Sequence, residues 1–253
     1  MKRTVKTDDN AGLIRPMKRK DDPVSGRDAM MVMIRNDLDR LLKSNHTGKP
    51  ARFDMGLFTL YQIKDKRGET LTLSGPFLGS PHAVMGMEKL IALGAERIWV
   101  LGWCGSLQPD LRIGDLVIPT NAVSEEGTSQ HYPITEKTPT SDRELGQVVV
   151  KALHRKGCPF KQGTIWTTDA PYRETPKKIK AFQRQGVLAV EMEMSALLTV
   201  AIYRGVKLTG LLVVSDELFD LKWHTGFSSP ELKKASRFAG QLLLSVISSM
   251  DEH

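Results

Sequence analysis

The stretch AVEMEMSAL at residues 189–197 carries two carboxylates, Glu191 and Glu193, on either side of Met192. The preceding VLAV is apolar enough for a buried strand, and the following SALLTVAIYRG has the length and apolar content of a buried helix. Burying an unpaired charge is costly, so two acids at a strand end require either solvation or polar partners. These glutamates are therefore candidates for binding a polar ligand.

Another acid, Asp216, stands at the end of the apolar run VVSDE at residues 213–217. A carboxylic acid at a strand end can act as a general acid if its surroundings favour its protonated form. Alternatively, Ser215 and Asp216 begin a turn or cap a helix. TTDAPYRET at residues 167–175 ends a further strand-like run, and Tyr172 there could stack on a flat ligand or belong to a proline-containing turn.

Glycine-rich and cysteine-containing segments add weaker candidates. GPFLGSP at residues 75–81 lies between a strand-like and a helix-like run, so its N–H groups could bind an anion or simply form a turn. It matches neither GxGxxG nor the Walker A loop. Cys104 has no neighbouring histidine, which indicates a packed small side chain rather than a nucleophile. The six histidines and two cysteines show no metal-ligand spacing, so we expect no metal.

The composition is that of a globular chain, because 40% of the 253 residues are hydrophobic. No apolar run reaches the roughly 20 residues of a membrane span, so we expect no membrane partner. The first residues lack the apolar core of a secretory signal. Two cysteines give no disulfide framework, and we therefore expect a reducing, cytoplasmic location.

The formal net charge is +7, and much of it falls at the start of the chain. Residues 1–27 hold eight basic residues against four aspartates, and we interpret them as a basic N-terminal arm. Nucleic-acid binding is disfavoured because no aromatic residues interleave with these charges; a solvated or subunit-contacting arm is the better interpretation. The modestly basic remainder suits small anionic ligands such as phosphate.

Strand-like and helix-like segments alternate between residues 70 and 250. Strands are predicted at RIWVLG, LVIPTNAV, GTIWTTD, VLAVEM and KLTGLLVVSD, with helical patterns between them and after the last. Earlier, AMMVMIRNDL begins with a strand, and FTLYQIK and ETLTLSG form a hairpin. This order predicts an α/β fold, with a single domain at residues 28–253 built on a central mixed, mostly parallel β-sheet flanked by helices. Ligands of such folds bind beyond the carboxyl ends of strands, where the polar clusters fall.

Three segments together resemble the purine/uridine phosphorylase family of the nucleoside phosphorylase-I superfamily. They are GSLQPDLRIGDLVIPTNAVSEEGTSQHY at residues 105–132, AVEMEMSAL and VVSD, and the likeness extends from about Arg52 to the last helix. The resemblance implies a mixed sheet flanked by helices and transfer of a nucleoside's ribosyl group to phosphate or water. It also implies inorganic phosphate as co-substrate, no metal or organic cofactor, and a homo-oligomer, either a dimer or a hexamer.

The resemblance assigns roles to the acids. Glu193 would accept hydrogen bonds from the sugar 2′- and 3′-hydroxyls, and Met192 would pack on the sugar ring. Glu191 would complete the ribose site as a structural or water-holding group. Such a carboxylate would stabilise positive charge that develops on the sugar as the bond breaks. Asp216 would protonate the base nitrogen, and Ser215 would orient it.

The same resemblance places the base pocket. Its residues would be Trp103, Gly105, Thr168, Pro171 and Tyr172. Uridine-cleaving members share a Gln-x-Arg after the corresponding loop, and APYRETPKK here contains none. A purine base is therefore the expected substrate.

The phosphate site follows the family pattern only in part. Arg40 in NDLDR keeps the arginine of the family's Gly-Asp-Pro-x-Arg turn, and Arg52 keeps a second arginine that in hexameric members serves the neighbouring subunit's site. Gly79, in the glycine-rich loop, would complete the phosphate site together with these arginines. Where the family has Arg-x-Gly-Ser/Thr, however, this chain has Val100 to Trp103, which removes one arginine and one hydroxyl.

This departure leaves three interpretations open. The first is a phosphorylase that yields free base and ribose 1-phosphate, with Arg40 and Arg52 as its anion ligands, aided by Arg35 or His82. The second is a phosphate-independent nucleoside hydrolase of the same fold, in which Trp103 fills the phosphate pocket. The third is a non-catalytic nucleoside-binding protein. We favour the phosphorylase.

Overall fold

The structure is a computed structural model, and it describes residues 12–43, 47–64, 68 and 70–250. The strands are, in chain order, β1 (Asp28–Val32), β2 (Thr47–Asp54), β3 (Thr59–Lys64), β4 (Thr70–Gly75), β5 (Arg97–Ser106), β6 (Leu116–Glu125), β7 (Lys161–Thr168), β8 (Ala189–Glu191), β9 (Lys207–Glu217) and β10 (His224–Thr225). The α-helices are α1 (Arg35–Leu42), α2 (Ser80–Ala92), α3 (Arg143–Arg155), α4 (Pro176–Arg184), α5 (Met194–Arg204) and α6 (Pro230–Ser248). Two short 3₁₀ turns are η1 (Ser129–His131) and η2 (Pro171–Arg173).

All ten described strands join one mixed sheet in the order β10-β9-β6-β7-β8-β5-β1-β4-β3-β2. Parallel pairs link β1 to β4 and β5, β5 to β9, and β7 to β6 and β8, whereas the other neighbours are antiparallel. Because β9 also pairs with β5, the strands from β9 through β5 close into a ring. The predicted α/β fold is confirmed, and this closure is a feature that the sequence pattern did not indicate.

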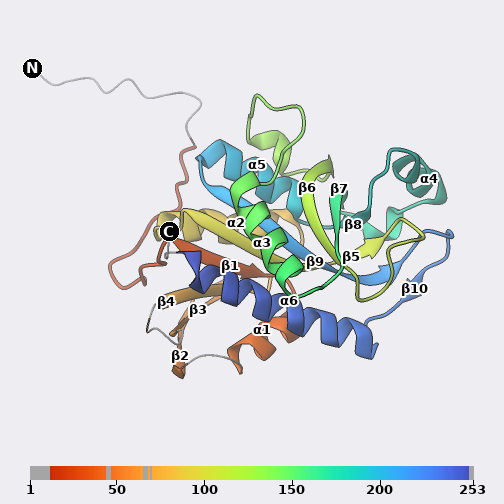
Figure 1. The fold of residues 1–253 in the computed structure, drawn as a ribbon. Helices are drawn as coiled ribbons and strands as arrows, with labels where there is room; N and C mark the ends of the chain where they lie inside the picture. The colour runs from red at the N-terminus through yellow and green to blue at the C-terminus, as the bar shows by residue number, and fades with distance from the viewer. Residues whose placement is uncertain (1–11, 44–46, 65–67, 69, 251–253) are drawn as a thin grey trace, which may run out of the picture.

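Helices cover both faces of the sheet, and α3 and α6 lie together across one of them (Figure 1). On that face, Leu38 of α1, Val149 of α3 and Leu243 of α6 belong to one buried apolar cluster. On the other face, Met87 of α2 and Leu197 of α5 belong to another. Burial of this apolar surface on both faces is the main force that holds the strand ends in place.

Most predicted elements occur where the sequence pattern indicated, and two differences concern the N-terminal half. The hairpin of β3 and β4 is present, paired from Thr59–Gly75 to Lys64–Thr70, and most of its turn lies outside the described residues. NDLDR, interpreted as a phosphate-binding turn, lies instead within helix α1, whose Leu38 and Leu41 are buried. Strand β2 was not predicted, because its polar TGKPARFD sequence shows no alternating apolar pattern.

The second half of the predicted arm contacts the body, whereas Leu13 and Ile14 are almost fully exposed. The Ser25 N–H donates to the Leu93 carbonyl at 3.0 Å, and Asp22 pairs with Lys89 of α2. The predicted boundary between the arm and the domain, at residue 28, stays a prediction. Among the described helices, none combines the length and the apolar character that crossing a bilayer requires.

Candidate active site

A cavity of about 490 Å³ opens at the carboxyl ends of β5 and β9, beside the β8–α5 junction. It brings together nine of the predicted site residues from separate segments: Trp103, Gly105, Pro171, Tyr172, Glu191, Met192, Glu193, Ser215 and Asp216. Strand pairing explains the convergence, since Gly105 lies opposite Val190 on one side and Asp216 on the other. Four predicted residues do not line it, namely Arg40, Arg52, Gly79 and Thr168.

Glu191 is held by structural donors at the start of α5. Its Oε2 accepts the backbone N–H groups of Glu193 at 2.7 Å and Met194 at 2.8 Å, and its Oε1 accepts the Thr167 hydroxyl. These two N–H groups lie at the start of α5 and have no partner within the helix. The N-cap residue Glu193 does not cap them, and Glu191 does so instead. Burial raises the pKa of Glu191 against these hydrogen bonds. This geometry fits the structural alternative for Glu191.

Glu193 is as buried as Glu191, with 7% of its surface exposed, and it lines the cavity. Its Oε1 accepts the Gly79 N–H at 2.6 Å. Burial, and next the charge of Glu191, raise the pKa of Glu193. A buried carboxylate that faces a cavity is stabilised by any ligand that brings hydroxyl donors to it.

Gly79 contacts the site through Glu193 and has φ 79° and ψ 158°, a region that is essentially restricted to glycine. We expect Gly79→Ala to lower the free energy of unfolding by about 1–3 kcal/mol because of backbone strain. A steric clash would not contribute, since a Cβ there meets no atom within 4 Å. Nucleoside KM should also rise as the N–H moves away from Glu193. Chemical denaturation and steady-state kinetics check both effects. Gly127→Ala, at an ordinary φ, is the control, and equal behaviour of the two variants would contradict the account.

Asp216 owes its position to a bulge in β9. The register shifts so that Cys104 pairs with Val214 and Gly105 with Asp216, which leaves Ser215 as the extra residue. Bulges of this kind re-aim side chains beside functional sites. The Ser215 hydroxyl lies 2.6 Å from Oδ1 of Asp216, and the indole N–H of Trp223 donates to Oδ2 at 2.8 Å.

Trp103 forms a wall of the cavity and is fixed on its far side. Its indole N–H lies 2.8 Å from Oδ2 of Asp37 in α1 and 2.9 Å from the Ser236 hydroxyl in α6. Its ring stacks on Phe227, with 6.1 Å between centroids and 15° between planes. The Trp103 side chain is therefore anchored between α1 and α6.

The other predicted base-pocket residues occupy different positions. A Cβ at Gly105 would lie 3.1 Å from Oδ2 of Asp216, so a side chain there would press on that carboxyl group. Pro171 and Tyr172 line the cavity from η2, and Tyr172 is 93% exposed at its mouth. Thr168 is buried behind the lining, and its hydroxyl accepts the Ala170 N–H at 3.2 Å.

Several lining residues were not predicted from the sequence, and three of them carry polar or aromatic groups that the site could use: Glu174, Trp223 and Phe227. Glu174 follows η2 and is part-buried; burial, and next the charge of Asp216, raise its pKa to about 7, while Lys178 opposes them. Trp223 reaches Asp216 because β10 folds back on β9 and pairs Thr225 with Asp216. Trp223 and Phe227 follow the polar strand end at Asp216 closely in the sequence, and this is the signal that could have identified them.

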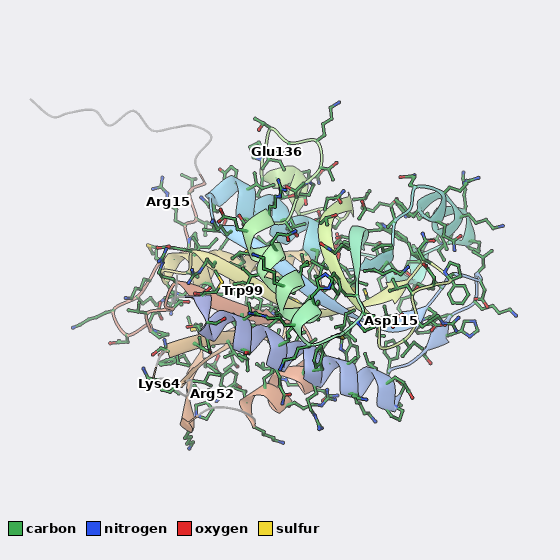
Figure 2. The ribbon with its side chains drawn as sticks, in the orientation of Figure 1. Arg15, Arg52, Lys64, Trp99, Asp115 and Glu136 are labelled. Carbon is green, nitrogen blue, oxygen red and sulfur yellow. The ribbon has the colours of Figure 1, made fainter. Side chains whose placement is uncertain are left out.

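Of the three predicted phosphate-binding residues, Gly79 donates its N–H to Glu193, and the two arginines lie away from the cavity. Arg40 pairs with Asp37 at 2.6 Å beneath Trp103. Burial raises the pKa of Asp37, and Arg40 opposes this most strongly. Arg52 lies on β2 at the edge of the sheet, as Figure 2 shows. Val100 is buried in the apolar core.

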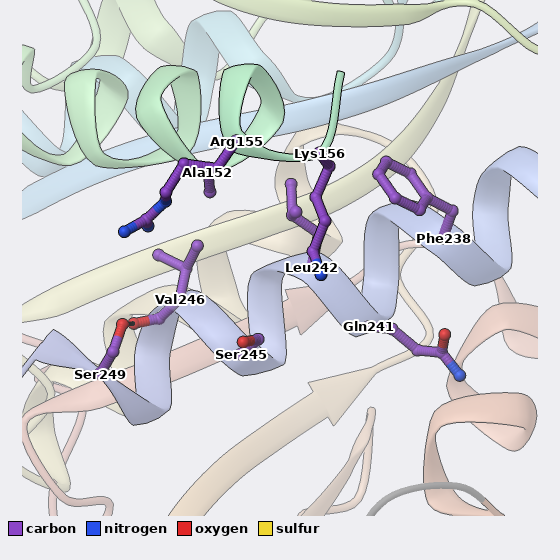
Figure 3. Close-up of a pocket in the computed structure, with 9 residues that line it drawn as sticks. All are labelled: Ala152, Arg155, Lys156, Phe238, Gln241, Leu242, Ser245, Val246 and Ser249. Atoms are coloured by element: carbon purple, nitrogen blue, oxygen red, sulfur yellow. Dashed lines mark hydrogen bonds between the residues drawn. The ribbon is translucent and has the colours of Figure 1, made fainter. Parts of the chain in front are cut away.

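Other hollows do not gather the predicted residues. One lies between α3 and α6 and is lined by Arg155, Lys156 and Phe238 among others (Figure 3). A larger one, of about 850 Å³, lies between residues 12–22 and the β2–β3 turn. Within the described residues, no group of three or more His, Cys, Asp or Glu side chains is arranged to hold a metal ion.

An aromatic, acid-lined cavity at the strand ends of a mixed α/β sheet defines a protein that binds a small polar ligand. The sequence matches the family profile of the phosphorylase superfamily over residues 31–248, and the chain belongs to that family. A guanosine phosphorylase of Halorubrum lacusprofundi is 30% identical over 151 residues, which are 60% of this chain and 63% of that protein. A DeoD-type purine nucleoside phosphorylase of Bacillus cereus is 31% identical over 155 residues, 60% of this chain and 66% of that protein. The chain thus matches less than two thirds of the length of these relatives.

Solved structures share the fold over nearly the whole chain. A purine nucleoside phosphorylase from Toxoplasma gondii in complex with immucillin-H superposes with a TM-score of 0.81 at 19% identity, covering 90% of this chain and 92% of that one. A uridine phosphorylase from Vibrio fischeri superposes with a TM-score of 0.79 at 18% identity, covering 89% and 93%. At these identities the likeness concerns the fold.

Proposed function

We propose that this protein is a nucleoside phosphorylase, which cleaves the N-glycosidic bond of a purine nucleoside with phosphate to give free base and ribose 1-phosphate. The observation that carries the proposal is the cavity itself. It sets the buried carboxyl group of Glu193 and the adjacent Met192 together with the Asp216 carboxyl group and aromatic walls, in a chain of the phosphorylase superfamily.

Each feature of the cavity has a place in this reaction. The Glu193 carboxylate accepts hydrogen bonds from the sugar hydroxyls and stabilises the positive charge that develops on the sugar. Trp103, Phe227 and Trp223 provide apolar surface on which a flat base can stack. The C–N bonding electrons leave with the base, which needs a proton, and a phosphate oxygen forms the new bond to the anomeric carbon. The proton comes from one of the other carboxyl groups of the cavity, Glu174 or Asp216.

A purine base is the proposed substrate because the loop that carries Pro171 and Tyr172 lacks a Gln-x-Arg. Base release should be measured by chromatography with inosine, adenosine, methylthioadenosine and uridine, each in phosphate buffer. We expect release from at least one purine nucleoside and much slower release from uridine. Cleavage of uridine alone would overturn the base assignment, and no cleavage of any nucleoside would overturn the function.

Hydrolysis is the second candidate, because one specific observation favours it. Among the described residues that line the cavity, the charged groups are all acids: Glu174, Glu191, Glu193 and Asp216. Arg40 is paired with Asp37, and the anchored Trp103 stands where the family carries a phosphate ligand. Base release at an undiminished rate without phosphate, with free ribose as the sugar product, would establish this reaction instead.

The assembly and the location are parts of the same proposal. We infer a homo-oligomer, because the exposed apolar side chains of Leu57, Leu78 and Met85 lie on the β2–β3 turn, the loop before α2, and α2 itself. Light scattering should give a mass of at least two chains, and a monomer at working concentration would contradict this. The unpaired cysteines Cys104 and Cys158 support the cytoplasm as the location.

A further inference from the structure

We propose that Glu174 is the acid that protonates the departing base, and that Asp216 stands beside it as its negatively charged partner. This assignment deepens the proposed function and rests on it. It differs from the role that family resemblance gives to Asp216, and the reason lies in how the two carboxyl groups are held.

The oxygens of Asp216 already face protein groups. An indole N–H can only donate, so Trp223 makes Oδ2 of Asp216 an acceptor. Oδ1 lies 2.6 Å from the Ser215 hydroxyl, which can donate to it. Both oxygens of Asp216 are thus held by protein donors, which leaves neither of them free to turn toward a bound base.

Glu174 is held differently. It lines the same cavity, from the loop that also supplies Pro171 and Tyr172. Among the residues that the structure describes, none donates a hydrogen bond to its side chain. Its carboxyl group is thus free to turn toward a base that stacks in the cavity.

The charges around Glu174 keep its proton in place near neutral pH. Burial and the negative charge of Asp216 on β9 raise its pKa to about 7, and Lys178 on α4 opposes them. Lys178 is itself paired with Glu125 at 2.7 Å. From the β8–α5 junction, Glu191 and Glu193 add carboxyl groups to the same cavity. Glu174 therefore shares the cavity with carboxyl groups from two other elements, β9 and the β8–α5 junction.

The proton transfer accompanies cleavage of the glycosidic bond. The glycosidic bond breaks, its electron pair stays on the base nitrogen, and that nitrogen takes the proton of Glu174. The phosphate oxygen closes the new bond to the sugar. Solvent at the mouth, beside the exposed Tyr172, returns a proton to Glu174 before the next turnover.

The test compares pH profiles of kcat/KM for inosine in the wild type, Glu174→Gln and Asp216→Asn. The wild-type rate should fall as Glu174 loses its proton above neutral pH. Glu174→Gln should be about 10²–10⁴-fold slower and should lack this fall. In Asp216→Asn the fall should persist but move to lower pH, because removing the negative charge lowers the pKa of Glu174. The titrations of inosine itself and of Glu193, whose pKa is also raised, are present in all three proteins, so only a fall that differs between them reports on Glu174.

A second substrate separates lost acid catalysis from lost structure. The base of 7-methylguanosine carries a positive charge and leaves without an added proton, so at mildly acidic pH Glu174→Gln should cleave it within about tenfold of the wild-type rate. A Glu174→Gln enzyme that keeps the fall above neutral pH, or is equally slow on both substrates, would overturn the role of Glu174 alone. A wild type that cleaves neither nucleoside would overturn the proposed function and, with it, this role.

Discussion

Replacing Glu193 by glutamine should lower kcat/KM for nucleoside cleavage by about 10²–10³-fold, the range found when one preorganised electrostatic group is removed from an active site. The amide keeps the size of the side chain and can still accept the Gly79 N–H. It loses the negative charge that stabilises the developing positive charge on the sugar. Steady-state base release from a purine nucleoside measures the effect.

The matched control is Glu96→Gln, which removes a carboxylate from an exposed ion pair with Arg27. Its activity should equal that of the wild type, because exposed pairs contribute little. Circular dichroism and denaturation should show that Glu193→Gln is folded. Burial raises the pKa of Glu193, so removing its charge should not destabilise the fold at neutral pH. Near-normal turnover by folded Glu193→Gln would remove Glu193 from the ribose site.

Replacing Trp103 by alanine should lower the free energy of unfolding by about 3 kcal/mol. The truncation removes the stacking on Phe227 and leaves a void between α1 and α6. It also takes a hydrogen-bond donor from Asp37, which is 2% exposed. Denaturant unfolding, with the slope compared between proteins, measures the change.

Trp103→Phe separates the two contributions. It keeps an aromatic ring beside Phe227 but cannot donate to Asp37 or Ser236, and a hydrogen bond lost from a buried group costs about 1–3 kcal/mol. We therefore expect its stability to lie between those of the wild type and Trp103→Ala. A fully stable alanine variant would show that Trp103 lines the cavity without anchoring it.

Sequence pattern predicted the fold because local and global signals agree over residues 70–250. Apolar strands alternate with amphipathic helices there, and parallel pairing brings their polar ends to one edge. The closure of β9 on β5 was not predictable in this way, because pairing between strands distant in the chain leaves no local pattern. Helix α1 was missed because Ile34, at its N-cap, provides no side-chain hydrogen bond.

The candidate site divides along the same line. Residues inside strand-end motifs, such as Glu193 and Asp216, could be singled out from their positions. Glu174, Trp223 and Phe227 could not, because loops that fold back carry them into the cavity. The position of Arg40 depended on its partner Asp37, and sequence does not show which arginine charges are already paired.

The measurement that tests the central claim most directly is the identity of the sugar product. Wild-type protein should be incubated with inosine and phosphate, and the products followed together by chromatography and phosphorus NMR. We expect ribose 1-phosphate and hypoxanthine to form in equal amounts, and both to form about 10²–10³-fold more slowly with Glu193→Gln. Hypoxanthine that accumulates with free ribose would contradict phosphorolysis, and unchanged inosine, with the other purine nucleosides also intact, would contradict nucleoside cleavage altogether.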